Sequence, residues 1–238
     1  VKGSELMQLT RTKSEKTKQT MDEKLNSLRA GVLGSNDGIL TVVGVLFSVA
    51  AATTNQFTIF IAGLSDLLAC AFSMASGEYA SVSTQKDTEK AVVEKERQLL
   101  KTDFEGELHA VQRHYMTLGV TEETAMAIAR DLLTKKPLAT VVSIKYDMQL
   151  GHYMNPWDAA FASLFSASAG GVFPLLAMTF APAHWQWPAT IIAVSVAVAL
   201  TGYLSAVLGK GNVKTAVIRN VLVGIVTMFI HYYVGTLF

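Results

Sequence analysis

Five long apolar stretches dominate this chain of 238 residues and restrict what it can fold into. A helix needs roughly 20 mostly apolar residues to cross the hydrocarbon core of a membrane. Five segments meet that requirement: residues 31–52, 57–78, 158–181, 186–208 and 214–236. Only 16% of the residues are charged, whereas soluble domains carry about a quarter. The sequence therefore predicts an all-α integral membrane protein with five transmembrane helices per subunit.

The basic residues indicate how the spans are oriented, because Lys and Arg favour the cytoplasmic side of a membrane. All 20 of them lie in the N-terminal tail, in residues 79–157, or around the link between the fourth and fifth spans. The opposite side carries none. We therefore expect a cytosolic N-terminus and a C-terminus on the other side. The short outer links favour a bacterial inner membrane, or a vacuolar membrane in a eukaryote.

This topology divides the chain into four parts. Residues 1–30 form a polar N-terminal tail, 31–78 hold spans 1 and 2, 79–157 form a cytosolic acidic domain, and 158–238 hold spans 3 to 5. The cytosolic domain is a helical insertion: a charged continuation of span 2, a helix ending near Gly119, one beginning after Thr121 and one beginning at Pro137. A single cysteine, Cys70, excludes an intramolecular disulfide framework and a cysteine-rich zinc site.

Three carboxylates fall within the spans, where hydrocarbon penalises them: Asp37, Asp66 and Glu78. In span 2 the residues Asp66, Cys70, Met74 and Glu78 recur every four positions, so they share one helix face. Carboxylates alone would suit protons or hard dications. An added thioether favours ferrous iron or another first-row metal such as Mn, Co, Ni or Zn.

Structural explanations compete with these functional ones. Cys70 and Met74 are also ordinary packing residues, and Glu78 is close enough to the cytosolic end of its span to reach water. Gly34 and Gly38 in span 1 permit close helix packing. That packing can occur between two copies of span 1, which would bring two Asp37 side chains together, or within one chain. The spacing does not decide between the two.

Several of these residues also form motifs that resemble those of the vacuolar iron transporter family. The segment Gly34–Leu40 (GSNDGIL) is similar to the family's first-span motif, and Ser73–Tyr79 (SMASGEY) is similar to its second-span signature. Gly171–Leu176 and Arg219–Gly224 fit the third and fifth spans. The resemblance implies a homodimer of five-span subunits that exports ferrous iron, and often manganese, in exchange for protons. It places the ion path between the two first spans, with Asp37 and Met74 as ligands and with Asp66 and Glu78 at related positions.

The cytosolic domain departs from the family pattern. Iron-transporting members carry a glutamate-rich metal site there, and the resemblance maps its ligands onto Glu96, Glu107 and Asp147. Leu99, Ala110 and Ser143 stand where other ligands are expected. Three carboxylates can still hold a hard dication. The alternative is a solvated acidic face balanced by neighbouring lysines and arginines.

These observations predict a secondary transporter that exports ferrous iron or a related divalent metal against protons, with the metal as substrate and with no tightly bound cofactor. The expected partners are a second copy of the chain, the lipid bilayer, metal ions and protons, and no nucleic acid. An enzyme is not expected, because no nucleophile has a base at a meaningful spacing. The alternatives are a transporter of another cation and a membrane-anchored metal sensor or buffer without flux.

Overall fold

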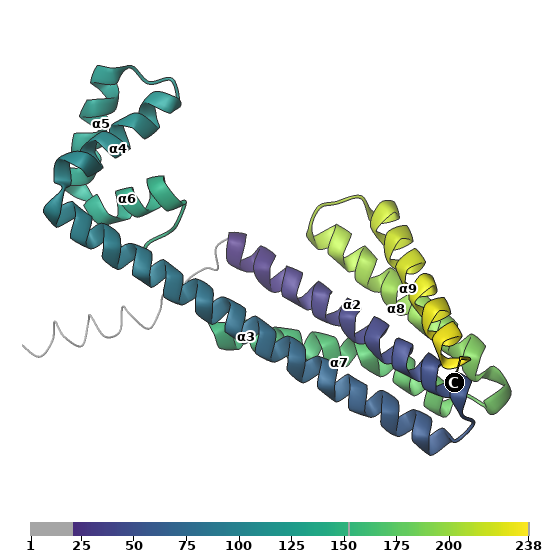
Figure 1. The fold of residues 1–238 in the computed structure, drawn as a ribbon. Coiled ribbons are helices and arrows are strands. Elements are labelled where there is room, and N and C mark those ends of the chain that lie inside the picture. Colours follow the sequence, from purple (N-terminus) through teal and green to yellow (C-terminus); the bar gives the residue numbers. More distant parts are fainter. Residues whose placement is uncertain (1–20, 152, 238) are drawn as a thin grey trace, which may run out of the picture. The chain divides into compact units, whose positions relative to one another are not determined.

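The computed structural model describes residues 21–151 and 153–237, and within them the chain is entirely helical (Figure 1). Eight α-helices and one short 3₁₀ turn, Ala183–Trp185, occur in these ranges, with no strand among them. The α-helices are α2 (Met21–Ala52), α3 (Gln56–Thr102), α4 (Phe104–Thr117), α5 (Glu122–Lys135), α6 (Pro137–Tyr146), α7 (Pro156–Phe180), α8 (Gln186–Leu208) and α9 (Val213–Gly235). The prediction of an all-α chain is confirmed.

Five of these helices, α2, α3, α7, α8 and α9, are long and apolar enough to cross a membrane. They coincide with the five apolar segments of the sequence, and α3 continues without a break from the second segment into the charged residues that follow. Large apolar side chains on them are exposed, such as Phe57 (71%) and Phe229 (70%). Exposed apolar surface of this kind suits contact with lipid, and the chain is an integral membrane protein.

Two of the short links between these helices end in a side-chain cap. Between α2 and α3, the Asn55 side chain accepts a hydrogen bond from the Thr58 backbone amide at 3.1 Å. Between α8 and α9, the Asn212 side chain accepts one from the Thr215 amide at 3.2 Å. Asn is a favoured N-cap because its side-chain oxygen satisfies an amide that the first helical turn leaves without a partner.

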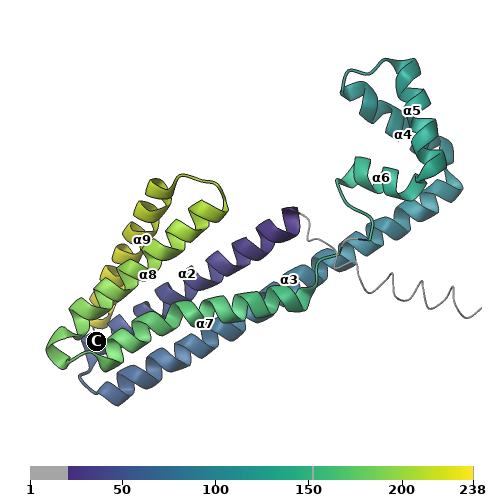
Figure 2. The same cartoon turned by 180° about the vertical axis from the view of Figure 1, so that it is seen from behind.

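Helix α2 supplies much of the core of the spanning unit. Its residues Ile39, Val42, Val43 and Leu46 are almost completely buried, and they belong to one apolar cluster with side chains of α3, α7, α8 and α9. α2 runs alongside these helices in both of two opposite views (Figures 1 and 2). Polar residues carried by α2 are therefore placed next to other spans of the same chain.

The glycines of α2 pack within the chain. A Cβ at Gly38 would collide with the backbone carbonyl oxygen of Ala167 in α7, and one at Gly34 would collide with the Ser166 hydroxyl. From the opposite side, a Cβ at Gly170 would meet the Ser35 carbonyl. Of the two explanations that the spacing left open, the structure shows the intramolecular one for this face.

Residues Ala80–Pro156 form a second compact unit, to which we refer as the insertion unit. Its apolar cluster contains Leu108, Val111, Ala129, Leu133 and Val141, which come from α4, α5 and α6. The helix boundaries follow local signals in the sequence. The Asp103 side chain caps α4, Thr121 precedes α5, and Pro137 is the first residue of α6.

Candidate functional site

One face of α3 carries the four residues that the sequence places every fourth position. Asp66, Cys70, Met74 and Glu78 are all half-buried, whereas Leu68 and Phe72 on another face of the same helix are exposed. Four residues of an α-helix rise about 6 Å. The stripe therefore extends along the helix with two carboxylates, a thiol and a thioether turned toward the protein.

Helix α2 brings a third carboxylate to this stripe. The Cys70 thiol donates to the Asp37 carboxylate, with 3.6 Å between Sγ and Oδ2. Asp37 also lies within electrostatic range of Asp66. The structure thus places Cys70 in contact with Asp37, and Asp66 in the same region, between two neighbouring helices of one chain.

Asp66 is the member of this group whose bonding is incomplete. Its Oδ2 atom is buried and has no hydrogen-bond partner among the described residues. Thr41 of α2 and His231 of α9 are among the polar groups near this carboxylate. A buried carboxylate oxygen without a donor is costly, so this atom offers an acceptor for a proton or a cation.

Met74 and Glu78 extend the stripe by one and two further turns of α3. Their half-buried side chains share a face with Asp66, but the structure does not gather them around Asp37. No cluster of three or more His, Cys, Asp or Glu side chains close enough to hold a metal ion occurs in residues 21–151 and 153–237. In the arrangement seen here, the stripe is a line of ligands rather than a closed metal cage.

Two polar neighbours of this group complete its surroundings. Thr41 lies one helical turn after Asp37, and its hydroxyl donates to the Asp37 backbone carbonyl at 3.0 Å. His231 packs against Gly44, and the Ser48 hydroxyl lies 3.3 Å from its Nδ1. The sequence could have pointed to Thr41, because it lies four residues after Asp37 and so shares a helix face with it. Nothing local in the sequence brings His231 to α2.

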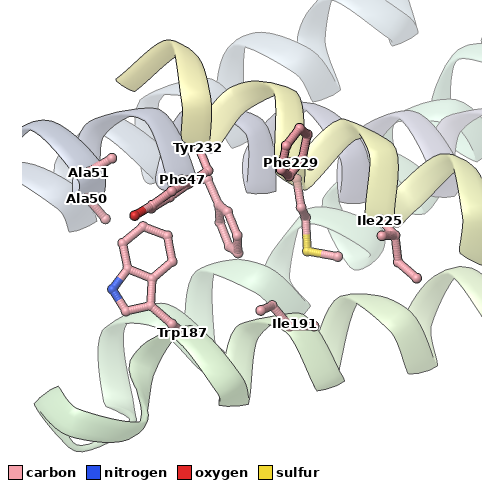
Figure 3. A pocket seen from close by; sticks show the side chains of 9 residues that line it. Phe47, Ala50, Ala51, Trp187, Ile191, Ile225, Phe229 and Tyr232 are labelled. Atoms are coloured by element: carbon pink, nitrogen blue, oxygen red, sulfur yellow. The ribbon is translucent and has the colours of Figure 1, made fainter. Parts of the chain in front are cut away.

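An apolar cavity of about 570 Å³ lies between α2, α8 and α9 (Figure 3). Aromatic side chains dominate it: the Trp187 ring stands edge-on to Phe47 at 4.9 Å and to Tyr232 at 5.2 Å, measured between ring centroids. Its lining contains no carboxylate, thiol or imidazole. Of the ligand types on the α3 stripe, its lining residues therefore supply only a thioether, that of Met228.

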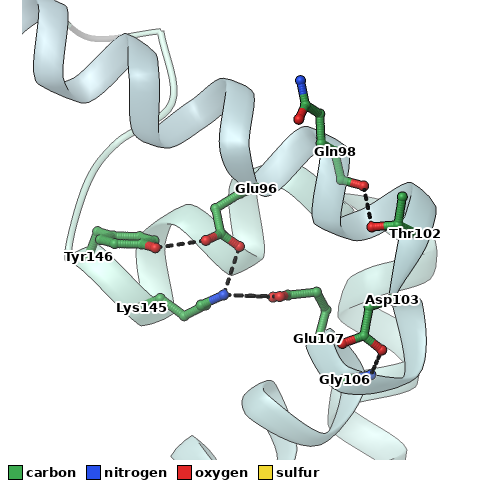
Figure 4. A network of polar contacts seen from close by, with 8 residues as sticks. All are labelled: Glu96, Gln98, Thr102, Asp103, Gly106, Glu107, Lys145 and Tyr146. Atoms are coloured by element: carbon green, nitrogen blue, oxygen red, sulfur yellow. Dashed lines mark hydrogen bonds and ion pairs between the residues drawn. The ribbon is translucent and has the colours of Figure 1, made fainter.

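In the insertion unit, Glu96 of α3 and Glu107 of α4 come together around a lysine (Figure 4). The family resemblance implies a metal site at these two residues. Lys145 Nζ of α6 lies 2.8 Å from Glu96 Oε2 and 3.0 Å from Glu107 Oε1. The Tyr146 hydroxyl donates to Glu96 Oε1 at 2.7 Å. Asp147 is not part of this network. It is an exposed residue that ends α6 in a left-handed conformation with φ 54°.

The proton affinities of the two donors reflect these contacts. Burial opposes the charged form of Lys145, but its hydrogen bonds and its attraction to Glu96 and Glu107 outweigh that effect and raise its pKa. The hydrogen bond to Glu96 raises the pKa of the Tyr146 phenol, and burial acts in the same direction. Sequence reasoning did not single out either donor, because Lys145 is 49 residues from Glu96 along the chain.

Comparison with known proteins gives a consistent result. A model of the VIT family matches residues 28–236. A vacuolar iron transporter of Acanthamoeba castellanii is 36% identical over 211 residues, which make up 88% of this chain and 78% of that protein. Vacuolar iron transporter homolog 5 of Oryza sativa subsp. japonica is 32% identical, over 90% of this chain and 82% of that protein. Vacuolar iron transporter homolog 2.1 of Arabidopsis thaliana is 29% identical, over 93% of this chain and 85% of that protein.

Proposed function

The chain belongs to the VIT family, and from this premise we propose that it is a secondary transporter of a divalent transition metal. Ferrous iron is the proposed substrate, with manganese, cobalt, nickel and zinc as related cargo, and protons move in the opposite direction. The names of its relatives support iron as cargo. The single observation that carries the proposal is the group formed by Asp37, Asp66 and Cys70 within the spans.

The placement of these side chains is difficult to explain by stability alone. An acid within a transmembrane segment costs several kcal/mol and is usually retained for a function. Here one carboxylate is supplied by α2 and another by α3, and the second has a buried oxygen without a donor. A dication between Asp37 and Asp66 would satisfy that oxygen and neutralise both charges.

The chemistry of the stripe favours a transition metal. Asp37, Asp66 and Glu78 supply hard oxygen ligands, and Met74 and Cys70 supply softer sulfur ligands. A mixed set of this kind suits ferrous iron and its neighbours better than magnesium or calcium. We assign Glu78 and Met74 to the cytosolic approach and Asp37 with Asp66 to the binding step.

Competition between metal and protons supplies the coupling. A carboxylate cannot ligate a dication and keep its proton, so protons and metal exclude each other at Asp37 and Asp66. Protonation from the outer side would release the metal. Metal binding from the cytosol would release the protons. A proton gradient then drives metal movement in one direction.

We further propose that the transporter is a homodimer with a cytosolic N-terminus and a C-terminus on the opposite side. The α2 face that holds Gly34 and Gly38 is occupied by α7, so a second copy must approach another face of α2. Leu33 lies on α2 and is 52% exposed. A dimer through that surface would bring the Asp37 residues of the two copies toward a common axis.

Uptake of ferrous iron into proteoliposomes with an imposed pH gradient tests the function. Asp37→Asn and Met74→Ala should each abolish uptake or lower it by at least roughly 10- to 100-fold, the loss typical when even an outer-shell partner of a metal site is removed. Asp131→Asn and Met116→Ala are matched controls, because both side chains are exposed on the insertion unit. Uptake that survives both path substitutions would contradict the assignment. Metal binding without any flux would favour a membrane-anchored sensor. Faster uptake of another cation than of ferrous iron would identify that cation as the cargo.

A further inference from the structure

Two buried carboxylates of the insertion unit share one ammonium group. Glu96 is 0% exposed and Glu107 is 5% exposed, and they belong to different helices, α3 and α4. Lys145 Nζ lies within 3.1 Å of both Glu107 oxygens and 2.8 Å from one Glu96 oxygen. Tyr146 donates to the other Glu96 oxygen at 2.7 Å. Each of the four carboxylate oxygens therefore already has a donor.

A metal ion at this position would need the carboxylate oxygens that already accept these hydrogen bonds. Hard dications bind carboxylate oxygens at about 2.0–2.6 Å and need several such ligands. An ammonium group supplies three hydrogen-bond donors and no acceptor, so it competes with a metal for the same oxygens and cannot itself be a ligand. Glu96, Glu107 and Lys145 together carry one net negative charge, which is a weak attraction for a dication.

The third acid that the family pattern suggests does not complete a site. Asp147 is exposed and ends α6, outside the network. Three other candidate ligands of the insertion unit have hydrogen-bond partners within it: Glu94 with Arg97, Asp103 with the Gly106 amide, and His109 with Gln112. The residues present thus do not fit the resident metal site that the family resemblance implies for this part of the chain.

We infer that the Lys145 ammonium is the permanent cation between Glu96 and Glu107, and that the insertion unit folds without a metal ion. In this protein, charge pairing inside one chain takes the place of metal bridging between α3, α4 and α6. The inference is independent of the proposed transport path, since it concerns residues outside the spans. It implies that metal reaches Glu78 directly from solution, without being collected by Glu96 and Glu107.

Equilibrium binding of Mn²⁺ to the full chain in detergent tests the first half of the inference. Glu96→Gln and Glu107→Gln should bind as many Mn²⁺ ions per chain as the unsubstituted protein. A decrease in that number by one or more in either variant would overturn the inference. Asp37→Asn reports separately on the proposed transport site. An unchanged number of bound Mn²⁺ ions in Asp37→Asn would count against that site and not against this inference.

Thermal unfolding in EDTA tests the second half. Lys145→Gln leaves two buried carboxylates without their cation. The Lys145 side chain is itself 26% exposed, and loss of this partly buried partner should lower the melting temperature by about 5–15 °C. Lys135→Gln is the matched control. Both side chains of the Lys135–Asp131 ion pair are exposed, so this substitution should change the melting temperature little. If Lys145→Gln does not fold, Lys145→Arg keeps the cation and should fold in EDTA, and any rise in its melting temperature with Mn²⁺ should persist when Glu96→Gln is added. A melting temperature of Lys145→Gln equal to that of the control, or stabilisation of unsubstituted protein by Mn²⁺ that Glu96→Gln abolishes, would overturn the inference.

Discussion

Replacing Gly38 by alanine is a direct test of how α2 and α7 pack. A Cβ at this position would lie 2.9 Å from the carbonyl carbon and 3.1 Å from the Cα of Ala167, and closer still to its carbonyl oxygen. All three are backbone atoms, which cannot rotate away. Restoring an ordinary carbon–carbon separation of about 3.5 Å requires the helices to separate by at least roughly 0.6 Å, and the closer carbonyl oxygen requires more.

The cost follows from this overlap. Overpacking of a well-packed interior typically costs about 1–3 kcal/mol. Alanine recovers up to about 1 kcal/mol through its better helix propensity. Taking about 2 kcal/mol for the overlap, the net cost is about 1–2 kcal/mol. At about 2–4 °C per kcal/mol for a chain of this size, Gly38→Ala should lower the melting temperature by about 2–8 °C.

Two other glycines of α2 provide matched controls. A Cβ at Gly31 meets nothing within 4 Å, so Gly31→Ala should leave the melting temperature unchanged or raise it slightly. At Gly34 the nearest obstructing atom is the Ser166 hydroxyl, a side-chain group that can rotate, and the Ser163 carbonyl oxygen follows at 3.2 Å. Gly34→Ala should therefore fall between the two. The assay is thermal unfolding of detergent-solubilised protein, followed by size-exclusion chromatography.

Equal melting temperatures for Gly31→Ala and Gly38→Ala would refute the close approach of α2 and α7. A second result would be equally informative. If Gly38→Ala kept its stability but lost a dimer on the column, the glycine face would serve the contact between two copies of the chain. The structure predicts loss of stability instead.

Two further predictions concern charged groups. Asp66→Asn removes the charge of a half-buried side chain whose buried Oδ2 has no hydrogen-bond donor among the described residues. It should raise the melting temperature by about 2–8 °C while metal flux falls. A lower melting temperature would show that the charge is structurally compensated. The raised pKa values of Lys145 and Tyr146 mean that the folded insertion unit holds these two protons more tightly than the unfolded chain. Their contribution to stability should be complete below their ordinary pKa values of 10.5 and 10.0 and should decline as pH rises through the raised values. Melting temperatures measured from pH 7 to strongly alkaline solution should show that decline, and Lys145→Gln should reduce it; identical curves would contradict the network.

The five spans and the helices of the insertion unit could be predicted because their signals are local. The length of an apolar run decides whether a helix can cross a membrane, and no distant residue alters that. Within the insertion unit, Thr121 and Pro137 mark helix starts, and Gly119 adopts a φ of +88° just after α4. A positive φ suits glycine, which has no Cβ to clash.

The sequence could not show which helix packs against a given helix face. The spacing of Gly34 and Gly38 predicts a close approach to some backbone, and a second α2 or another span of the same chain satisfies it equally. The structure supplies α7, whose own small residues Ala167 and Gly170 meet α2. Complementarity between two distant segments decides such a choice, and one segment alone cannot reveal it.

In the candidate sites, too, local features could be predicted from the sequence and contacts between distant residues could not. The stripe from Asp66 to Glu78 follows from helical periodicity, and the structure places all its members on one half-buried face. The environment of Glu96 does not follow from periodicity, because its partners Lys145 and Tyr146 are 49 and 50 residues away. Acidic residues at metal-ligand spacing look the same in sequence whether a metal or a lysine lies between them.

Anomalous scattering from crystals soaked in Co²⁺ would test most directly whether the polar stripe between α2 and α3 carries metal. The proposed path predicts a peak beside Asp37 and Asp66 that disappears in Asp37→Asn, and no peak between Glu96 and Glu107. Crystals that show ordered Co²⁺ only outside the spans, from protein that still transports the ion, would contradict it.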